Sequence, residues 1–183
     1  MKYLIASDIH GSKRATQMVL DHFKAEGADM LILLGDLLYH GPRNDLPQEY
    51  DPRAVAALLN GMKDRIIAVR GNCEAEVDQM MLEFPCMGDY TIIYIEGVPF
   101  FLTHGHLYND DNLPPMVTPS TVLLHGHTHV PTNLRHDTHR TMNPGSTTIP
   151  KRASAPSYMV IDGNNIYWKK LTDASVYMVD RVK

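Results

Sequence analysis

The chain has 183 residues, of which 44% are hydrophobic and 21% charged, and its formal net charge at pH 7 is -4. This length and composition are typical of a globular protein, so we expect residues 1–183 to form a single domain. The acidic balance and the scattered lysines and arginines argue against a protein that binds duplex nucleic acid, which usually carries a clustered basic excess.

Three features of the sequence indicate the cellular compartment of the protein. No apolar segment approaches the roughly 18 residues that a membrane span requires. The N-terminal apolar run is broken at Ser7-Asp8, unlike the apolar core of a signal peptide. Two cysteines, Cys73 and Cys86, are too few for a disulfide framework. We therefore expect a cytoplasmic protein without membrane association.

The first half of the chain alternates strand and helix. Short apolar runs at 3–7, 30–34 and 65–69 predict buried strands, because unbroken runs are expected where both faces of a sheet are covered. Ser12 can cap one connecting helix, and Asp51-Pro52 can start the other. Such a βαβαβ unit places its strands parallel, and parallel sheets bind ligands at the carboxyl ends of their strands.

The second half is predicted to be rich in strands. A short helix is expected near 76–82, followed by a hairpin around Glu96-Gly97. Residues 107–119 are predicted to form a loop. Further strands are expected at 122–124 and 141–142, and a last hairpin pairs 158–161 with 166–171. The chain is thus expected to have an α/β fold.

Side chains that commonly bind metals follow five of these predicted strands. They are Asp8 and His10, Asp36, Asn72, His104 and His106, and His127 and His129. Each alone has an ordinary structural explanation, such as a capped turn or a hydrogen-bonded core histidine. Their occurrence together at five strand ends predicts a metal site with mixed nitrogen and oxygen ligands.

The five motifs resemble those of a known family. Asp8-Ile9-His10, Gly35-Asp36, Gly71-Asn72-Cys73-Glu74, Thr103-His104-Gly105-His106 and Gly126-His127-Thr128-His129 are similar to the motifs of the calcineurin-like metallophosphoesterases, and the similarity extends from residue 3 to about residue 150. The chain is similar in particular to small bacterial phosphodiesterases of that superfamily. The resemblance implies a four-layer αββα sandwich and a dinuclear metal-dependent phosphodiesterase, which hydrolyses a small-molecule phosphodiester by attack of a metal-bridging hydroxide.

The resemblance also implies a ligand set for two divalent ions. One ion would be held by Asp8, His10, Asp36 and His129, and the other by Asp36, Asn72, His104 and His127, with Asp36 as the bridge. The donor types favour Mn²⁺, with Zn²⁺, Fe or Ni²⁺ as alternatives, over the all-oxygen sites of Ca²⁺ and Mg²⁺. Two such ions about 3.5–4 Å apart supply a nucleophile and stabilise phosphoryl charge.

Cys73 stands where many relatives place a histidine that assists the leaving group. A thiol is a weak hydrogen-bond donor, so Cys73 is either a weak catalytic group or a small packed side chain. The candidates for contact with substrate phosphate are His40, Arg43, Asn44, Arg70 and His106, for which a solvated loop position is the alternative. His22, His136 and His139 are expected on the surface, and His125 is expected to pack at a strand end.

Two other function classes stay open. One is a metal-free interaction scaffold, because a retromer subunit has this fold in degenerate form; the complete ligand set argues against it. The other is a nuclease like the larger double-strand-break exonucleases of the superfamily, which the acidic balance disfavours. The expected partner is a small-molecule phosphodiester, and the sequence leaves the natural substrate and a homo-oligomeric state open.

Overall fold

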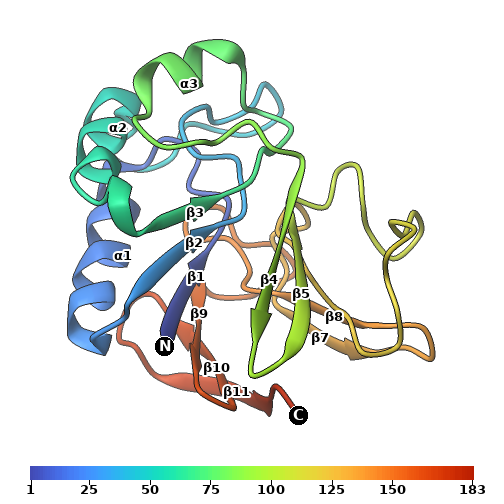
Figure 1. The fold of residues 1–183 in the computed structure, drawn as a ribbon. Coiled ribbons are helices and arrows are strands. Elements are labelled where there is room, and N and C mark those ends of the chain that lie inside the picture. Colours follow the sequence, from blue (N-terminus) through green and yellow to red (C-terminus); the bar gives the residue numbers. More distant parts are fainter.

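Two β-sheets packed against each other form the centre of the protein in a computed structural model that describes residues 1–183 (Figure 1). The six-stranded sheet contains, in spatial order, β11 (Val176–Arg181), β10 (Asn165–Lys170), β9 (Ser157–Asp162), β1 (Lys2–Ala6), β2 (Met30–Leu33) and β3 (Ile66–Ala68). The five-stranded sheet contains β4 (Tyr90–Ile95), β5 (Val98–Thr103), β6 (Val122–Leu124), β8 (Arg140–Asn143) and β7 (Thr132–Arg135).

The predicted βαβαβ unit is confirmed. Strands β1, β2 and β3 are parallel neighbours, and helices α1 (Lys13–Glu26) and α2 (Pro52–Asn60) connect them. The Ser12 side chain accepts a hydrogen bond from the Ala15 amide at 3.2 Å, and Gly27 ends α1 with a φ of 62°. Both helices lie on the outer face of the six-stranded sheet (Figure 1). A 3₁₀ turn (Lys63–Arg65) precedes β3, and α3 (Glu76–Met81) follows it.

The core divides into two clusters because successive side chains of a strand point to opposite faces. In β1, Leu4 and Ala6 join the cluster beneath the helices, whereas Tyr3 and Ile5 join the cluster between the sheets. Trp168 is fully buried in the latter, and its indole N–H donates to the Asn143 carbonyl at 2.8 Å. The cluster between the sheets therefore joins the βαβαβ half of the chain to the β-rich half.

The predicted hairpins are confirmed, whereas two edge strands were missed. β4 pairs antiparallel with β5 around Glu96-Gly97, and β9 pairs antiparallel with β10. Strands β7 and β11 lie at the edges of their sheets, and all of their side chains are partly buried or exposed. An edge strand need not carry the apolar run of a buried strand, so these segments lacked that signal.

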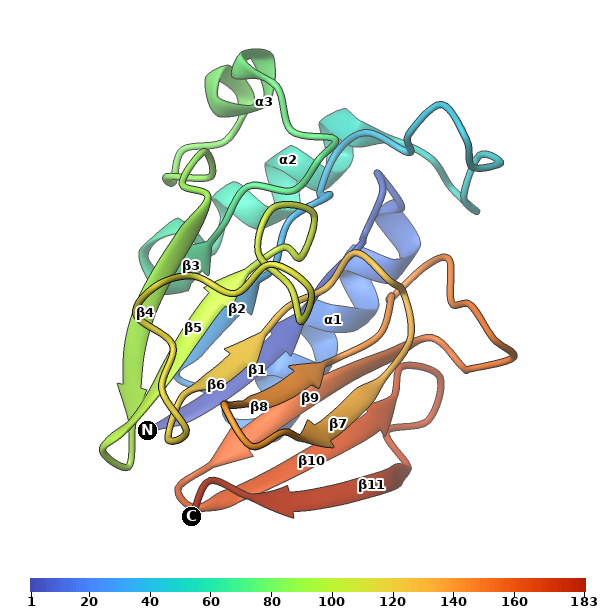
Figure 2. The ribbon, with the colours of Figure 1, turned by 90° about the vertical axis from the view of Figure 1, so that its right-hand side faces the viewer.

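The expected fold class is confirmed: two mixed sheets, with helices on the outer face of the six-stranded one, match the calcineurin-like metallophosphoesterase fold. Part of the outer face of the five-stranded sheet is covered by the loop between β5 and β6, where Figure 2 shows residues 104–121 crossing the strands. Tyr108 of this loop packs edge-on against Phe101 and Tyr90 at ring-centroid distances of 5.6 and 5.9 Å. No helix of the protein is both long and apolar enough to cross a membrane.

Candidate metal centre

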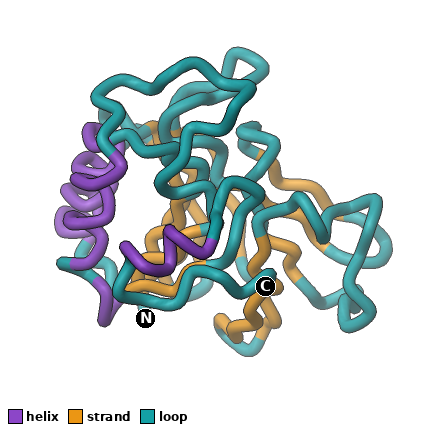
Figure 3. Tube along the Cα trace, turned by 90° about the horizontal axis from the view of Figure 1, so that it is seen from above, coloured by secondary structure: helices purple, strands orange, loops and turns teal.

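The predicted ligands lie at the end of the molecule where parallel strands of both sheets terminate. Asp8 and His10 follow β1, and Asp36 and Asn72 follow β2 and β3. The other three histidines follow β5 and β6. Seen from above, loops lie over this end while the two long helices run down one side (Figure 3). All seven side chains that the resemblance implied are brought together here: Asp8, His10, Asp36, Asn72, His104, His127 and His129.

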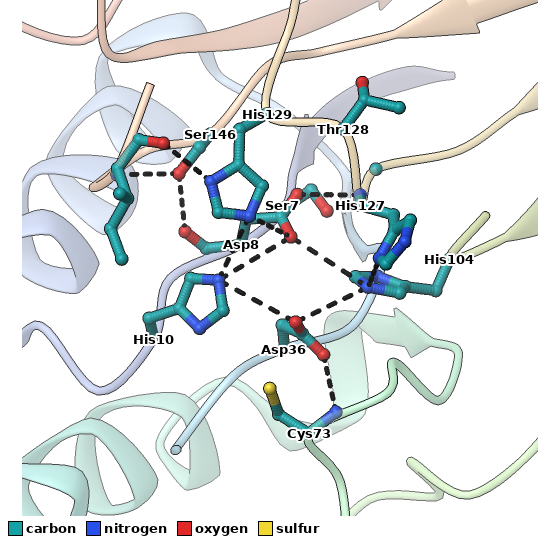
Figure 4. A network of polar contacts seen from close by, with 12 residues as sticks. Ser7, Asp8, His10, Asp36, Cys73, His104, His127, Thr128, His129 and Ser146 are labelled. Atoms are coloured by element: carbon teal, nitrogen blue, oxygen red, sulfur yellow. Dashed lines mark hydrogen bonds and ion pairs between the residues drawn. The ribbon is translucent and has the colours of Figure 1, made fainter. Parts of the chain in front are cut away.

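Asp36 lies between the two halves of the cluster (Figure 4). Its Oδ2 is 3.7 Å from His10 Nε2 and 3.5 Å from His104 Nε2. Its Oδ1 accepts a hydrogen bond from the Cys73 amide at 2.9 Å. Asn72 is placed beside it, with Oδ1 3.1 Å from His104 Nε2. One carboxylate oxygen thus faces imidazoles from two different loops, as a bridging ligand would.

Asp8 is a buried carboxylate with one oxygen left without a donor. Its Oδ2 accepts a hydrogen bond from the His127 amide at 3.1 Å, whereas Oδ1 is buried and has no hydrogen-bond partner. Oδ1 lies 3.2 Å from His129 Nε2 and 3.8 Å from His10 Nε2. An unpaired buried carboxylate oxygen is costly, and a cation bound between it and the imidazoles would remove that cost.

The imidazoles are held by backbone carbonyls on their outer side. The Nδ1 atoms of His10, His104 and His129 lie 3.0, 2.6 and 2.6 Å from the carbonyl oxygens of Tyr39, Leu34 and Ile149. A carbonyl can only accept, so Nδ1 carries a proton and donates, and Nε2 is the ring nitrogen that faces the cluster. This arrangement orients histidine ligands in metal sites. His127 instead directs Nδ1 inward, 3.3 Å from His104 Nε2.

The backbone at five of the candidate ligands is strained. Asp8, His10, Asp36, His127 and His129 all have φ values between 50° and 64°, in the left-handed region. Such a conformation costs a residue other than glycine about 1–3 kcal/mol, and it accumulates at functional sites where the surroundings enforce it. Five strained residues in one cluster indicate that the loops are shaped to place these side chains.

Glu74 holds two of the ligand loops in position. Its buried carboxylate accepts hydrogen bonds from the amides of Asp36 at 2.8 Å and Leu37 at 2.6 Å, and also from the amide of Gly71. Burial and the charge of Asp36 raise the pKa of Glu74 to about 7. The carboxylate therefore ties the loop after β2 to the loop after β3.

The electrostatics favour a positive charge within the cluster. Burial would raise the pKa of Asp36, but the contact with His104 and its charge lower it well below the usual range. Burial would lower the pKa of His104, but Asp36 and Asp8 raise it to about 9. Burial and the charge on His104 lower the pKa of His127 to about 4. Without a metal ion, the carboxylates retain one imidazolium as their counter-charge.

A cleft of about 500 Å³ opens onto the cluster. It is lined by His10, Asp36, Gly41, Pro42, Arg43, Asn44, Asn72, Cys73, His127, Thr128, His129 and Lys151. Of the residues predicted to contact phosphate, Arg43 and Asn44 lie in this lining. His106 lies beside the cluster, with its ring centroid 5.4 Å from that of His104.

The other two residues predicted to contact phosphate lie outside the cleft lining. The His40 ring packs between Tyr39 and Tyr50, at centroid distances of 4.7 and 5.2 Å. The Arg70 Nε donates to Asp89 Oδ1 at 2.8 Å, so an acidic partner already offsets its charge. Arg43 and Asn44 are therefore better placed for a ligand in the cleft.

Cys73 stands between the cleft and a neighbouring apolar pocket. It lines the cleft and also a pocket of about 360 Å³, whose walls include Tyr39, Tyr50, Val77 and Met81. Burial, followed by the charge of Asp36, raises the pKa of the Cys73 thiol far above its ordinary value. The side chain is thus a neutral thiol at the edge of the metal centre.

Several supporting residues escaped the sequence analysis. The Ser146 hydroxyl donates to the Asp8 carbonyl at 2.8 Å, and Asn143 Nδ2 donates to the Gly126 carbonyl at 2.6 Å. Both belong to Asn143-Pro144-Gly145-Ser146, where only a strand end had been predicted. Lys151 adds a cation to the cleft lining. These two hydrogen bonds could not be predicted from local sequence, because each joins segments more than 15 residues apart.

The remaining histidines differ in part from expectation. His125 is buried at the end of β6, as predicted, and His136 is exposed. The prediction that His139 lies on the surface is wrong: only 3% of it is exposed, because it packs against His136 and Asp110. His22 is partly buried, stacked on Tyr158.

Comparison with known proteins agrees with this geometry. Residues 1–165 match the family model described as the calcineurin-like phosphoesterase superfamily domain. Phosphodiesterase YfcE of Escherichia coli strain K12 is 46% identical over 176 residues, which is 96% of this chain and 95% of that protein.

Solved structures extend the comparison. The structure of YfcE, a phosphoesterase from E. coli, superimposes with a TM-score of 0.96 at 43% identity and covers all of both chains. Vacuolar protein sorting 29 of Cryptosporidium parvum has a TM-score of 0.63 at 19% identity, over 98% of this chain and 96% of that one, and so shares the fold.

The family match spans most of the sequence, and it includes every strand end that carries a predicted ligand. The chain therefore belongs to the calcineurin-like phosphoesterase superfamily.

Proposed function

We propose that the protein is a metal-dependent phosphodiesterase that hydrolyses small-molecule phosphodiesters. The observation that carries this proposal is the buried pair Asp8 and Asp36, whose inward oxygens face imidazoles while Asp8 Oδ1 has no donor. Side chains of this kind fit two divalent cations. The name of the E. coli relative, phosphodiesterase, supports the same reaction class.

The proposed ligand sets share Asp36. Asp8, His10, Asp36 and His129 would hold one ion, and Asp36, Asn72, His104 and His127 the other. Mn²⁺ is the ion we propose for both positions, because mixed imidazole and carboxylate ligands suit it. When bound, a pair of divalent ions lowers the pKa of water and offsets the negative charge on phosphoryl oxygens.

The chain itself would orient the substrate. Arg43, Asn44 and Lys151 line the cleft from the side of the solvent, so they supply two cations and an amide for the phosphate oxygens. The backbone carbonyls behind His10, His104 and His129 fix the imidazoles. A cleft of about 500 Å³ is of the size that holds a small organic ligand.

The apolar pocket beside Cys73 indicates which substrates fit. Its lining includes two tyrosines, Tyr39 and Tyr50, together with Val77 and Met81. Since Cys73 lies in both linings, a diester bound at the metals could place one ester group in this pocket. We propose that this group is aromatic, such as an aryl or a nucleobase-bearing alcohol, because aromatic walls favour ring stacking.

The experiment is a substrate screen with chelator-treated protein reconstituted with Mn²⁺. Aryl diesters, dinucleotides, cyclic nucleotides and alkyl diesters are compared, with Asp36→Asn as the inactive control. We expect metal-dependent hydrolysis that is fastest for diesters with an aromatic group. Protein that binds two Mn²⁺ ions yet hydrolyses no diester would refute the proposal.

Two further measurements separate the alternatives. A metal-free scaffold would bind no ion tightly in metal analysis of chelator-free protein. A nuclease would digest single-stranded DNA faster than any small diester. A cytoplasmic setting stays part of the proposal, resting on the two free cysteines Cys73 and Cys86.

A further inference from the structure

A second group of ligand-type side chains lies apart from the proposed ligands. Asp110 comes from the loop over the five-stranded sheet, and His136 and His139 come from the turn between β7 and β8. Asp110 Oδ1 is 2.9 Å from His139 Nε2, and Asp110 Oδ2 is 3.7 Å from His136 Nε2. One ligand atom from each side chain lies within 4.8 Å of the others.

The two imidazoles present the same atom to one carboxylate. Their rings are stacked, with centroids 4.4 Å apart and an interplanar angle of 11°. The turn that carries them is closed by a hydrogen bond from the His136 amide to the His139 carbonyl at 2.8 Å. The backbone of a tight hairpin turn therefore holds the pair in register. Two imidazole nitrogens and a carboxylate are ligands that Zn²⁺ and neighbouring late first-row ions prefer.

Part of the cluster is already held in place by the protein. His139 is buried, and its Nδ1 lies 2.9 Å from the Thr138 hydroxyl, which positions the ring from behind. Asp110 Oδ1 also accepts a hydrogen bond from the Thr141 hydroxyl. The side chains of Asp110 and His136 are 37% and 34% exposed, so an ion could enter and could complete its coordination with water.

The position of His136 favours a metal site over a plain hydrogen-bond network. Asp110, His139 and Thr141 already form a complete network without it. A separation of 3.7 Å between His136 Nε2 and Asp110 Oδ2 is too long for a hydrogen bond. Two ligands about 2.1 Å from one tetrahedral ion lie roughly 3.4 Å apart. The observed spacing is thus close to that of two ligands of a shared cation.

We propose that Asp110, His136 and His139 bind one late first-row divalent cation, of which Zn²⁺ is the reference. The site shares no residue with the dinuclear centre, and its existence does not depend on the proposed function. A cation there would fasten the loop that starts at His104 and carries His106 to the β7–β8 hairpin. Zn²⁺ would therefore fix this loop against the hairpin without being a catalytic ion.

The test is a comparison of Zn²⁺ binding by variants of the full chain. Chelator-treated protein is titrated with Zn²⁺ by calorimetry, and the bound zinc is counted by elemental analysis after desalting. His136→Ala removes a side chain without a hydrogen bond in the cluster, so it should fold like the wild type. Asp110→Asn keeps the shape and removes the charge. Asp137→Asn is the matched control, because this exposed carboxylate is on the same turn and outside the cluster.

We expect His136→Ala and Asp110→Asn each to bind one zinc equivalent fewer than the wild type and Asp137→Asn. In Co²⁺-substituted protein, the same two variants should lose part of the visible absorption. Equal zinc stoichiometry and affinity in all four proteins would overturn the proposal and leave the cluster as a hydrogen-bonded anchor. Asp36→Asn tests the dinuclear centre separately. If that centre binds no ions, Asp36→Asn will hold as much zinc as the wild type, and the difference between His136→Ala and Asp137→Asn will be unaffected.

Discussion

The Asp36 carboxylate contacts groups from more of the surrounding loops than its neighbours do. It faces imidazoles of two loops through one oxygen and binds the Cys73 amide through the other. Asp8 is more buried, but its free oxygen is nearest to His129. At the scale of single residues, therefore, the proposed metal ligands are not equivalent.

We predict that Asp36→Asn reduces activity more than any other single ligand change. The amide keeps an acceptor for Cys73 but loses the charge that both ions would share. Since removing a group that only supports a ligand typically costs about 10–100-fold, losing a bridging ligand should cost more. The measurements are kcat/KM and metal content. Two tightly bound ions with near-normal turnover would contradict the bridging role.

His129→Ala and His127→Ala should each deplete a different ion. His129 lies beside Asp8 and His10, whereas His127 lies beside His104. Anomalous scattering from crystals of the two variants, grown with Mn²⁺, would show which position empties. The assignment fails if both variants lose the same ion.

Cys73 should make the enzyme depend strongly on the acidity of the leaving group. Its thiol is a poor donor and its pKa is raised, so it offers little help to a departing alkoxide. We predict that Cys73→His gives a shallower dependence of rate on leaving-group pKa, since general acid help is worth about 10²–10⁴-fold. A series of aryl phosphodiesters measures the slopes, with Cys73→Ala as control. Three identical slopes in metal-loaded proteins would show that residue 73 only packs.

At the scale of elements, the site depends on how closely the strand-end loops approach one another. The loops after β2 and β3 meet at Gly71, where an added Cβ would lie 2.5 Å from the Asp36 backbone nitrogen and would overlap its carboxylate. Glu74 joins the same two loops through three amides. The parallel pairing of β2 and β3 brings these loops together, so their packing and the metal centre depend on each other.

Gly71→Ala should therefore weaken metal binding as well as stability. The methyl group has no space beside Asp36, so the loop must shift and displace a proposed bridging ligand. Gly88→Ala is the matched control, because its Cβ would have only an ordinary contact at 3.7 Å. Metal content, kcat/KM and thermal midpoint are measured for both. If Gly71→Ala keeps wild-type metal affinity, the close approach is not needed for the site.

At the scale of the whole molecule, the proposed metal centre would couple metal binding to the stability of the fold. Ions that bind only the folded chain stabilise it by about 2.7 kcal/mol for each site at 100 times the dissociation constant. For a chain of this size, 1 kcal/mol shifts the thermal midpoint by about 2–4 °C. Chelation should thus lower the midpoint by roughly 5–10 °C for each ion removed.

Chelator-treated protein should also lose stability as pH rises from about 6.5 to about 9. Burial lowers the pKa of His104, but Asp36 and Asp8 raise it more, to about 9 in the folded protein. A group whose pKa is higher in the folded than in the unfolded protein stabilises the fold at pH values below its unfolded pKa. This contribution is lost as the pH rises through the folded pKa, and for His104 the loss is on the order of 3 kcal/mol. Thermal unfolding across this range in chelator measures the loss.

With Mn²⁺ present, the imidazole is a neutral ligand and this loss should disappear. Asp36→Asn, which removes one of the charges facing His104, should flatten the dependence in chelator. If stability falls with pH in the same way with and without Mn²⁺, the link between His104 titration and stability is contradicted.

Local pattern was sufficient to predict the βαβαβ unit, both hairpins and the strand ends at which the candidate ligands lie. Buried strands have unbroken apolar runs, and the polar residues that interrupt them mark the strand ends. Those ends are gathered by parallel pairing, so their convergence at one site was also predictable. The resemblance to a family supplied the assignment of ligands to two ions.

Other features depended on contacts between distant segments. The edge strands β7 and β11 lack a buried apolar run, and loop 104–121 packs on part of its sheet through Tyr108. The support by Glu74 and Ser146, the unpaired oxygen of Asp8, and the burial of His139 beside Asp110 arise only when the chain is folded. The sequence by itself determined which residues end the strands, because an apolar run and the polar residue that interrupts it are visible within a short stretch of chain. Only the tertiary structure decided which atoms meet, because that depends on how the two sheets pack.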